Sequence, residues 1–232
     1  MKKNIEIEFK FQVLDKEQIE NFLKNLNFIG EKKIVDIYLD TEKGDLYKKG
    51  VFIRIRNNKT LDFKFNLEDF QNLKMKSNHE HCDEYSFPLP LTNESIESIN
   101  QVCKILSLQG IEAAALEELK NINNFTDSMI IDKVRKKYSD GEFEYSFDDI
   151  KELGLFLEIE AHASDKKNLE KIKEEMKKKI QNLKLKLVTT GYNELYWRKY
   201  NFELYKQGRY FLEGVEENGR IKSFDRRVCK RN

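Results

Sequence analysis

The sequence predicts an α+β fold in which amphipathic helices cover an antiparallel sheet. Several short segments alternate apolar with charged residues, which is the pattern of half-buried strands. Other segments repeat apolar residues at helical spacing. The resulting order is a strand, a helix, a run of strands, helices, a second run of strands and a helix. Strands that follow one another in runs favour antiparallel pairing, which defines the class as α+β.

Strict alternation predicts five strands, at residues 5–11, 51–56, 61–66, 143–148 and 155–162. Two further stretches, 34–39 and 130–138, are strand-like with less regular alternation, and residues 84–89 are another candidate. In the first strand, Glu6, Glu8 and Lys10 share one face while apolar side chains occupy the other. The sheet is therefore expected to have an apolar face and a charged face.

Helical spacing of apolar residues predicts helices at 16–27, 94–108, 112–121, 165–182 and 192–200. Asp15 is a candidate N-cap of the first helix, and Gly110 separates the second from the third. The apolar stripes of these helices need a surface to cover, and the outer wall of a β-barrel would provide it. We expect residues 1–200 to form one domain, followed by a C-terminal extension, 201–232, whose role the pattern does not assign.

The composition excludes several classes of protein. The 232 residues are 36% charged, but the aromatic content of 12% is typical of a folded chain. A formal net charge of +1 gives no support to general nucleic-acid binding. The cysteines Cys82, Cys103 and Cys229 have no metal-ligand spacing and fit free thiols in a reducing compartment. Since no apolar stretch is long enough to cross a membrane and the first residues are highly charged, we expect a cytoplasmic protein.

The charged faces of the predicted strands are sorted by sign. Lys64 is central in its strand, Arg54 and Arg56 share a face, and so do Glu158 and Glu160. If these faces line a closed barrel, the buried charges need partners of both signs, and a divalent cation with a polyanion such as triphosphate would supply them. The alternative is a solvated sheet face with ion pairs across strands. The repetition of the pattern on five strands favours the barrel.

Several motifs in one order resemble those of the CYTH superfamily, the triphosphate tunnel metalloenzymes, which include class IV adenylyl cyclases and thiamine triphosphatases. They are EIEFK (6–10), DIYLDT (36–41), FIRIR (52–56), LDFKF (61–65), DKVRKKY (132–138), FDDIKELGLFLEIEAH (147–162) and GYNELYW (191–197). Together they span roughly residues 4–198, and the block that ends at 162 is the most specific. Gly191 departs from the serine that is common at that position of the family motif. The resemblance implies an antiparallel closed β-barrel, the triphosphate tunnel, with amphipathic helices packed on its outside.

The resemblance also implies site residues. The candidate ligands of Mg²⁺ or Mn²⁺ are Glu6, Glu8, Glu158 and Glu160, with Asp148 close by. The positions that match the family's triphosphate-binding residues are Lys10, Arg54, Arg56, Lys64 and Arg135, and Lys133 and Lys137 share the face of Arg135. Lys64 and Tyr38 are the candidate catalytic residues, with Tyr38 assisting a leaving group. A tyrosine on a half-buried strand also has a purely structural explanation.

The family performs different reactions in one tunnel, so three functions remain open. The first is metal-dependent hydrolysis of inorganic triphosphate, thiamine triphosphate or a nucleoside triphosphate. The second is the class IV adenylyl cyclase reaction, in which the ribose 3′-hydroxyl attacks the α-phosphate and pyrophosphate leaves. The third is a non-catalytic nucleotide- or polyphosphate-binding module, which the full set of carboxylates argues against. Hydrolysis requires the fewest specific contacts from the site, so it is the function we expect. The expected partner is a small triphosphate. Residues 201–232 could form a helix cap, the arm of a homodimer or a lid, and their basic end is expected to be a solvated tail.

Overall fold

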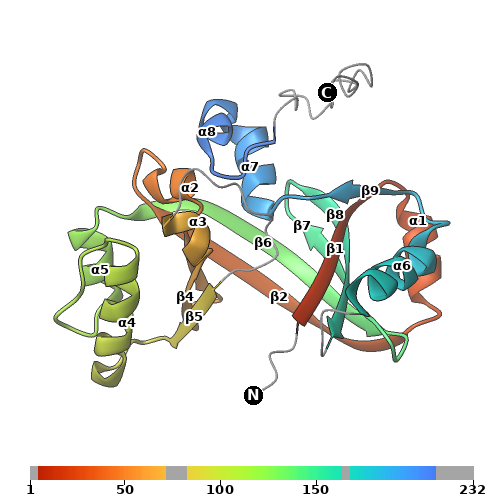
Figure 1. Ribbon diagram of the computed structural model, residues 1–232, viewed down its shortest axis with the longest axis horizontal. Helices are drawn as coiled ribbons and strands as arrows, with labels where there is room; N and C mark the ends of the chain where they lie inside the picture. The colour runs from red at the N-terminus through yellow and green to blue at the C-terminus, as the bar shows by residue number, and fades with distance from the viewer. Residues whose placement is uncertain (1–4, 72–82, 164–167, 213–232) are drawn as a thin grey trace, which may run out of the picture.

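The structure is a computed structural model that describes residues 5–71, 83–163 and 168–212. Its centre is a nine-stranded antiparallel sheet with the order β5-β4-β3-β2-β6-β7-β8-β1-β9. The strands are β1 (Ile5–Val13), β2 (Asn27–Asp40), β3 (Phe52–Arg56), β4 (Thr60–Phe65), β5 (Asp83–Pro88), β6 (Thr126–Ser139), β7 (Glu144–Ile150), β8 (Gly154–Ala163) and β9 (Leu185–Val188). The long strands β2 and β6 cross the molecule and join its two ends (Figure 1).

The α+β class is confirmed, but the closed barrel is not. Strands β5 and β9 stand at opposite ends of the strand order, and within the described residues no hydrogen-bonded ladder joins one to the other. Closure depends on the number, tilt and stagger of the strands, which the alternation of side chains does not specify. The sheet is therefore barrel-like, but among the described residues its hydrogen-bonded ladders do not close it into a ring.

Two groups of helices cover the apolar face of the sheet, one at each end of the molecule (Figure 1). At one end, α4 (Asn93–Ile105) and α5 (Leu116–Ile122) pack against β3, β4 and β5, with Ile53, Phe63 and Ile99 in the shared core. At the other end, α1 (Lys16–Leu23) and α6 (Leu169–Ile180) pack against β1, β7 and β8, around the fully buried Tyr145. The period of two in the strands and the apolar stripes of the helices explain this arrangement.

A third group of helices lies between the two ends. Helix α7 (Tyr192–Tyr200) brings Leu195 onto Met129 and Phe156, which belong to β6 and β8. Helix α2 (Asp45–Lys49) follows β2, and the carboxylate of Asp40 accepts hydrogen bonds from the backbone N–H groups of Thr41, Leu46 and Tyr47. The Asp-Thr pair that ends the DIYLDT motif therefore starts a helix. The short helix α3 (Leu67–Gln71) follows β4.

The described part of the expected C-terminal extension packs against α2. Helix α8 (Phe202–Gln207) places the Leu204 side chain beside Gly44, while Gly208 lies against the ring of Tyr47. Tyr205 is fully buried. Residues 201–212 therefore continue the folded structure, and the remainder of the extension, 213–232, lies outside the described residues.

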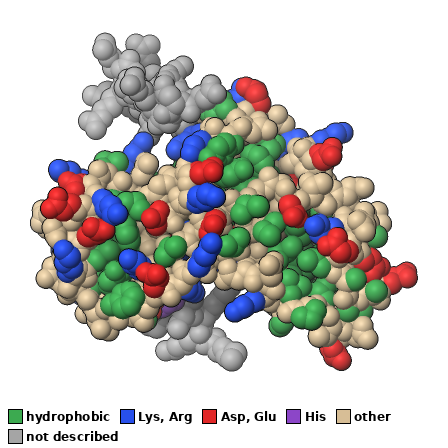
Figure 2. Space-filling view, turned by 180° about the vertical axis from the view of Figure 1, so that it is seen from behind, with side chains coloured by type: hydrophobic (Ala, Val, Ile, Leu, Met, Phe, Trp, Pro, Cys, Tyr) green, Lys and Arg blue, Asp and Glu red, His purple; other side chains and the backbone are tan. Residues whose placement is uncertain are grey.

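The surface carries charges of both signs. Lys and Arg side chains lie interspersed with Asp and Glu side chains on the face seen from behind (Figure 2), in agreement with the net charge of +1. Within the described part of the chain, every helix is too short or too polar to cross a membrane.

Candidate functional site

The register of the sheet brings the charged side chains of eight strands to one side. Residues directly opposite each other in an antiparallel ladder share a face, and Lys10 stands opposite Glu158 while Arg135 stands opposite Asp148. We call this side the polar face. It carries Glu8, Lys10, Asp36, Arg54, Arg56, Asp62, Lys64, Glu84, Lys133, Arg135, Lys137, Glu144, Asp148, Glu158 and Glu160. Five of these side chains are buried, which contradicts a fully solvated face: Asp36, Asp62, Lys133, Asp148 and Glu158.

Three carboxylates of the polar face form a candidate metal site. Oxygen atoms of Glu8, Glu158 and Glu160 all lie within 4.8 Å of one another. Burial and the charges of Glu8 and Glu158 raise the pKa of Glu160, as expected where like charges are close. Three hard oxygen donors suit Mg²⁺ or Mn²⁺, so the residues present fit the metal that the sequence predicts. Glu6 lies on β1 opposite His162, but its side chain is outside the described residues.

Lys10 lies beside this group of carboxylates. Its Nζ is 3.3 Å from Oε1 of Glu8 and 3.2 Å from Oε1 of Glu158. Burial lowers the pKa of Lys10, but the charges of Glu158 and Glu8 outweigh this effect and raise the pKa to about 12. Lys10 is therefore a cation at physiological pH.

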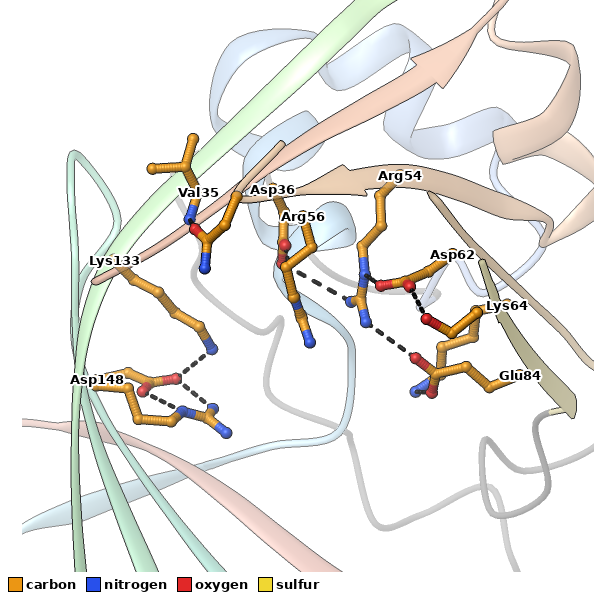
Figure 3. A network of polar contacts seen from close by, with 12 residues as sticks. Val35, Asp36, Arg54, Arg56, Asp62, Lys64, Glu84, Lys133 and Asp148 are labelled. Carbon is orange, nitrogen blue, oxygen red and sulfur yellow. Dashed lines mark hydrogen bonds and ion pairs between the residues drawn. The ribbon is translucent and has the colours of Figure 1, made fainter. Parts of the chain in front are cut away.

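Asp148 is the centre of a buried ion-pair cluster next to the carboxylates. It is 0% exposed and accepts hydrogen bonds from Nζ of Lys133 and from both Nε and a terminal nitrogen of Arg135, each at 2.6 Å. Arg135 also donates to Glu158. Burial raises the pKa of Asp148, but the hydrogen bonds of Arg135 and the charge of Lys133 hold it below its usual value. Lys133 and Asp148 face each other in Figure 3.

A second cluster occupies the other end of the polar face, on β2 to β5 (Figure 3). Arg56 forms a bidentate pair with Asp36 at 2.7 and 2.8 Å. Arg54 donates through Nε to Asp62 and through a terminal nitrogen to Glu84, both at 3.0 Å. Planar guanidinium groups held in this way have fixed directions, and their remaining N–H groups suit phosphate oxygens.

The other predicted residues lie at the margins of these clusters. Lys64 is partly exposed and 3.9 Å from Glu84, while Lys137 is 2.9 Å from a carboxylate oxygen of Glu144. Tyr38 lies opposite Arg54 on β2, and burial raises the pKa of its phenol. The polar face thus includes every predicted site residue whose side chain is described.

Sequence reasoning missed three residues of the site. Asp36 and Asp62 orient the two arginines, and the period of two in β2 and β4 could have placed both on the polar face. Tyr192, at the start of α7, lies 2.9 Å from Oε1 of Glu158 and 3.0 Å from Oδ2 of Asp148. Its only sequence signal is its place in the GYNELYW motif.

Glu194 explains another part of that motif. Its carboxylate lies against Gly191, the N-cap residue of α7, at the position of the glutamate of a capping box. Gly191 has no side chain for the reciprocal bond, and Oε1 of Glu194 is buried without a partner. Burial raises the pKa of Glu194 to about 7.

The sequence model of the CYTH domain matches residues 4–192, so the chain belongs to the CYTH family. A Methanocaldococcus jannaschii protein named "Putative adenylate cyclase MJ0240" is 24% identical over 196 residues, which cover 82% of this chain and 98% of that protein. Among solved structures, the PH1819 protein of Pyrococcus horikoshii has a TM-score of 0.53 at 20% identity, over 82% of this chain and 97% of that one. The PH1012 protein of the same organism has a TM-score of 0.52 at 18% identity, over 82% and 99% of the two chains. Both structures support the fold.

Proposed function

We propose that the protein is a divalent-metal-dependent triphosphatase that converts a triphosphate and water into a diphosphate and phosphate. The observation that carries this proposal is the group formed by Glu8, Glu158 and Glu160, which lies on the same sheet face as two clusters of basic side chains. A triphosphate needs cations along its whole length, and a metal ion together with ordered arginines and lysines provides them.

The residues of the polar face divide into roles. Glu8, Glu158 and Glu160 would hold Mg²⁺ or Mn²⁺, with Glu6 as a further candidate ligand and Asp148 as the group that keeps Lys133 and Arg135 in place. The bound metal would neutralise phosphate oxygens and lower the pKa of water. The proposed triphosphate-binding residues are Lys10, Arg54, Arg56, Lys64, Lys133, Arg135 and Lys137.

Ordering of these cations is the main contribution of the chain to substrate binding. Asp36 and Asp62 fix the two guanidinium groups before substrate arrives, so less side-chain freedom is lost when the phosphate oxygens bind. Tyr38 lies opposite Arg54 and is buried in the apolar cluster under α7, and its proposed role is to assist a leaving group at the phosphate that Arg54 binds. Its raised pKa keeps the phenol protonated, and a protonated phenol can donate a hydrogen bond.

A class IV adenylyl cyclase is the second candidate function. It is favoured by the name of the Methanocaldococcus jannaschii relative. Cyclisation would use the same metal and the same cations, with the 3′-hydroxyl of ATP as the nucleophile and pyrophosphate as the leaving group. A non-catalytic binding module is the third candidate function. Binding of a polyanion requires only the basic residues. The three carboxylates, whose oxygen atoms lie within 4.8 Å of one another, would repel a polyanion unless a cation is bound between them.

Product analysis separates the three functions. Purified protein is incubated with tripolyphosphate, thiamine triphosphate or ATP and with Mg²⁺ or Mn²⁺, and the products are separated by anion-exchange chromatography. Release of phosphate supports the triphosphatase, whereas cyclic AMP with pyrophosphate supports the cyclase. Binding of every triphosphate without turnover supports the module.

A pair of variants on neighbouring strands tests the metal site. Glu160 and Glu144 stand opposite each other on β8 and β7, but only Glu160 belongs to the group of three carboxylates. Glu160→Gln is expected to reduce turnover at least about 100-fold, whereas Glu144→Gln retains most of it, because Glu144 contacts Lys137 and does not belong to the group of three carboxylates. Equal activity of both variants would contradict the proposed metal site.

A further inference from the structure

Lys10 occupies the side of the carboxylate group that faces α7. Its ammonium contacts the same two residues, Glu8 and Glu158, that contribute to the candidate metal site. The third direction of the ammonium is covered by the ring of Tyr192, whose centroid is 4.6 Å away. Two carboxylates and an aromatic ring therefore surround the ammonium.

This arrangement pairs the charge of Lys10 with the carboxylates and not with a phosphate. The lysine side chain is 17% exposed, and the Glu158 side chain 5%, so solvent screens their attraction only weakly. A triphosphate that approached this ammonium would have to compete with two carboxylates. The function expected of Lys10 from its motif therefore requires a change of partners.

A divalent cation would cause that change. It would use carboxylate oxygens that Lys10 now contacts, and it would neutralise the repulsion within the group that Lys10 now offsets. Two cations on one set of carboxylates repel each other, so the mobile side chain is the one that leaves. The lysine stem is flexible, and its ammonium can then turn to a neighbouring anion.

We propose that Lys10 is an internal competitor of the divalent cation, and that cation binding releases its ammonium to the triphosphate. The inference rests on the proposed function, because it requires that this site accept both a metal ion and a triphosphate. By linkage, the cation then raises the affinity for triphosphate, and triphosphate raises the affinity for the cation by the same factor.

The chain offers a matched control for this role. Lys120 on α5 also lies between two carboxylates, at 3.0 Å from Asp127 and 3.9 Å from Glu117, and its side chain is 19% exposed. It belongs to the helices that cover β3 to β5, away from the polar face. Lys10→Met and Lys120→Met remove the same charge from lysine side chains of similar exposure, although the carboxylate partners of Lys120 are more exposed. Only the first removes a competitor from the candidate metal site.

The experiment is a calorimetric titration of the full chain with Mn²⁺ in the absence of any phosphate. Lys10→Met and Lys10→Gln are expected to bind Mn²⁺ about 10-fold more tightly than the wild type, and Lys120→Met to bind it within 2-fold of the wild type. Circular dichroism spectra verify that each variant is folded. Unchanged or weaker Mn²⁺ binding by both folded Lys10 variants would overturn the inference, while triphosphate turnover by the wild type would leave the proposed function standing.

A second titration tests the coupling. Imidotriphosphate, whose bridging nitrogens resist hydrolysis, is titrated into each protein with and without Mn²⁺. Mn²⁺ is expected to raise the affinity of the wild type at least 10-fold more than that of Lys10→Met. Equal enhancement in both proteins would overturn the release of Lys10. Failure of the wild type to bind Mn²⁺ and to turn over any triphosphate would overturn the proposed function together with the inference.

Discussion

The phenolic oxygen of Tyr192 lies 2.9 Å from Oε1 of Glu158 and thereby joins α7 to the polar face of the sheet. Burial and the charges of Glu158 and Asp148 raise the pKa of this phenol well above its usual value. The hydroxyl therefore stays protonated and can donate a hydrogen bond to a carboxylate. The aromatic ring also contacts the ammonium groups of Lys10 and Lys133, at 4.6 and 4.8 Å. One residue outside the sheet thus touches both the carboxylates and the cations of the site.

Removal of this hydroxyl should loosen the attachment of α7. Tyr192→Phe is expected to lower the free energy of unfolding by about 1.5–3 kcal/mol, the usual contribution of a hydrogen bond to a charged group. Urea denaturation followed by circular dichroism measures the difference. Tyr196→Phe, on the same helix and in the same apolar cluster, is the control. Equal losses in the two variants would show that the contact with Glu158 contributes nothing.

Asp148 should matter for stability even without substrate. Asp148→Asn keeps the shape of the side chain but leaves Lys133 and Arg135 without their main counter-charge. We expect a loss of about 3–5 kcal/mol in the free energy of unfolding, because one partner of a buried ion pair is removed. Glu144→Gln breaks the partly exposed pair with Lys137 and should cost less than about 1 kcal/mol. A loss for Asp148→Asn no larger than that of Glu144→Gln would contradict the structural role.

The sequence predicted the faces of the strands better than their ends. Alternation assigned Lys10 and Arg54 to the charged side because a period of two depends only on the pleat of each strand. The strand expected at 34–39 begins at Asn27 instead, since residues 27–33 alternate poorly and are held by pairing with β6. The helix expected at 16–27 ends at Leu23, because the chain already enters β2 at Asn27. Such boundaries depend on tertiary contacts, which the residue pattern of a single segment does not specify.

The contacts between the site residues also could not be predicted from the sequence. Arg54 was predicted to bind phosphate, but its contacts with Asp62 and Glu84 follow from the register of β3, β4 and β5. Register between strands that are distant in the chain is not contained in the alternation of either strand. The approach of Tyr192 to Glu158 depends in turn on how α7 packs on the sheet.

Asp62 offers a test of whether orientation of Arg54 matters for binding. Asp62→Asn removes the charge that holds Nε of Arg54, and it is expected to raise the KM for triphosphate about 10-fold with less than a 2-fold change in kcat. Ser86 donates a 2.7 Å hydrogen bond to the other oxygen of Asp62, so Ser86→Ala should change KM in the same direction by a smaller factor. Steady-state kinetics with the preferred triphosphate measures both. A fall in kcat at constant KM would exclude a role of Asp62 in binding.

Glu194 should make stability depend on pH. Its pKa is raised from 4.5 to about 7 because the carboxyl group is buried, so the folded protein keeps this proton to a higher pH than the unfolded chain does. The free energy of unfolding is therefore expected to fall as the pH rises from 4.5 to 7 and to be independent of Glu194 above that range. Each pH unit between these values contributes about 1.4 kcal/mol, about 3 kcal/mol in all. Glu194→Gln, which cannot ionise, should lack this decrease, whereas Glu203→Gln, at an exposed position of α8, should follow the wild type. Urea denaturation at a series of pH values measures the three profiles, and parallel profiles of Glu194→Gln and the wild type would show that Glu194 ionises normally in the folded protein.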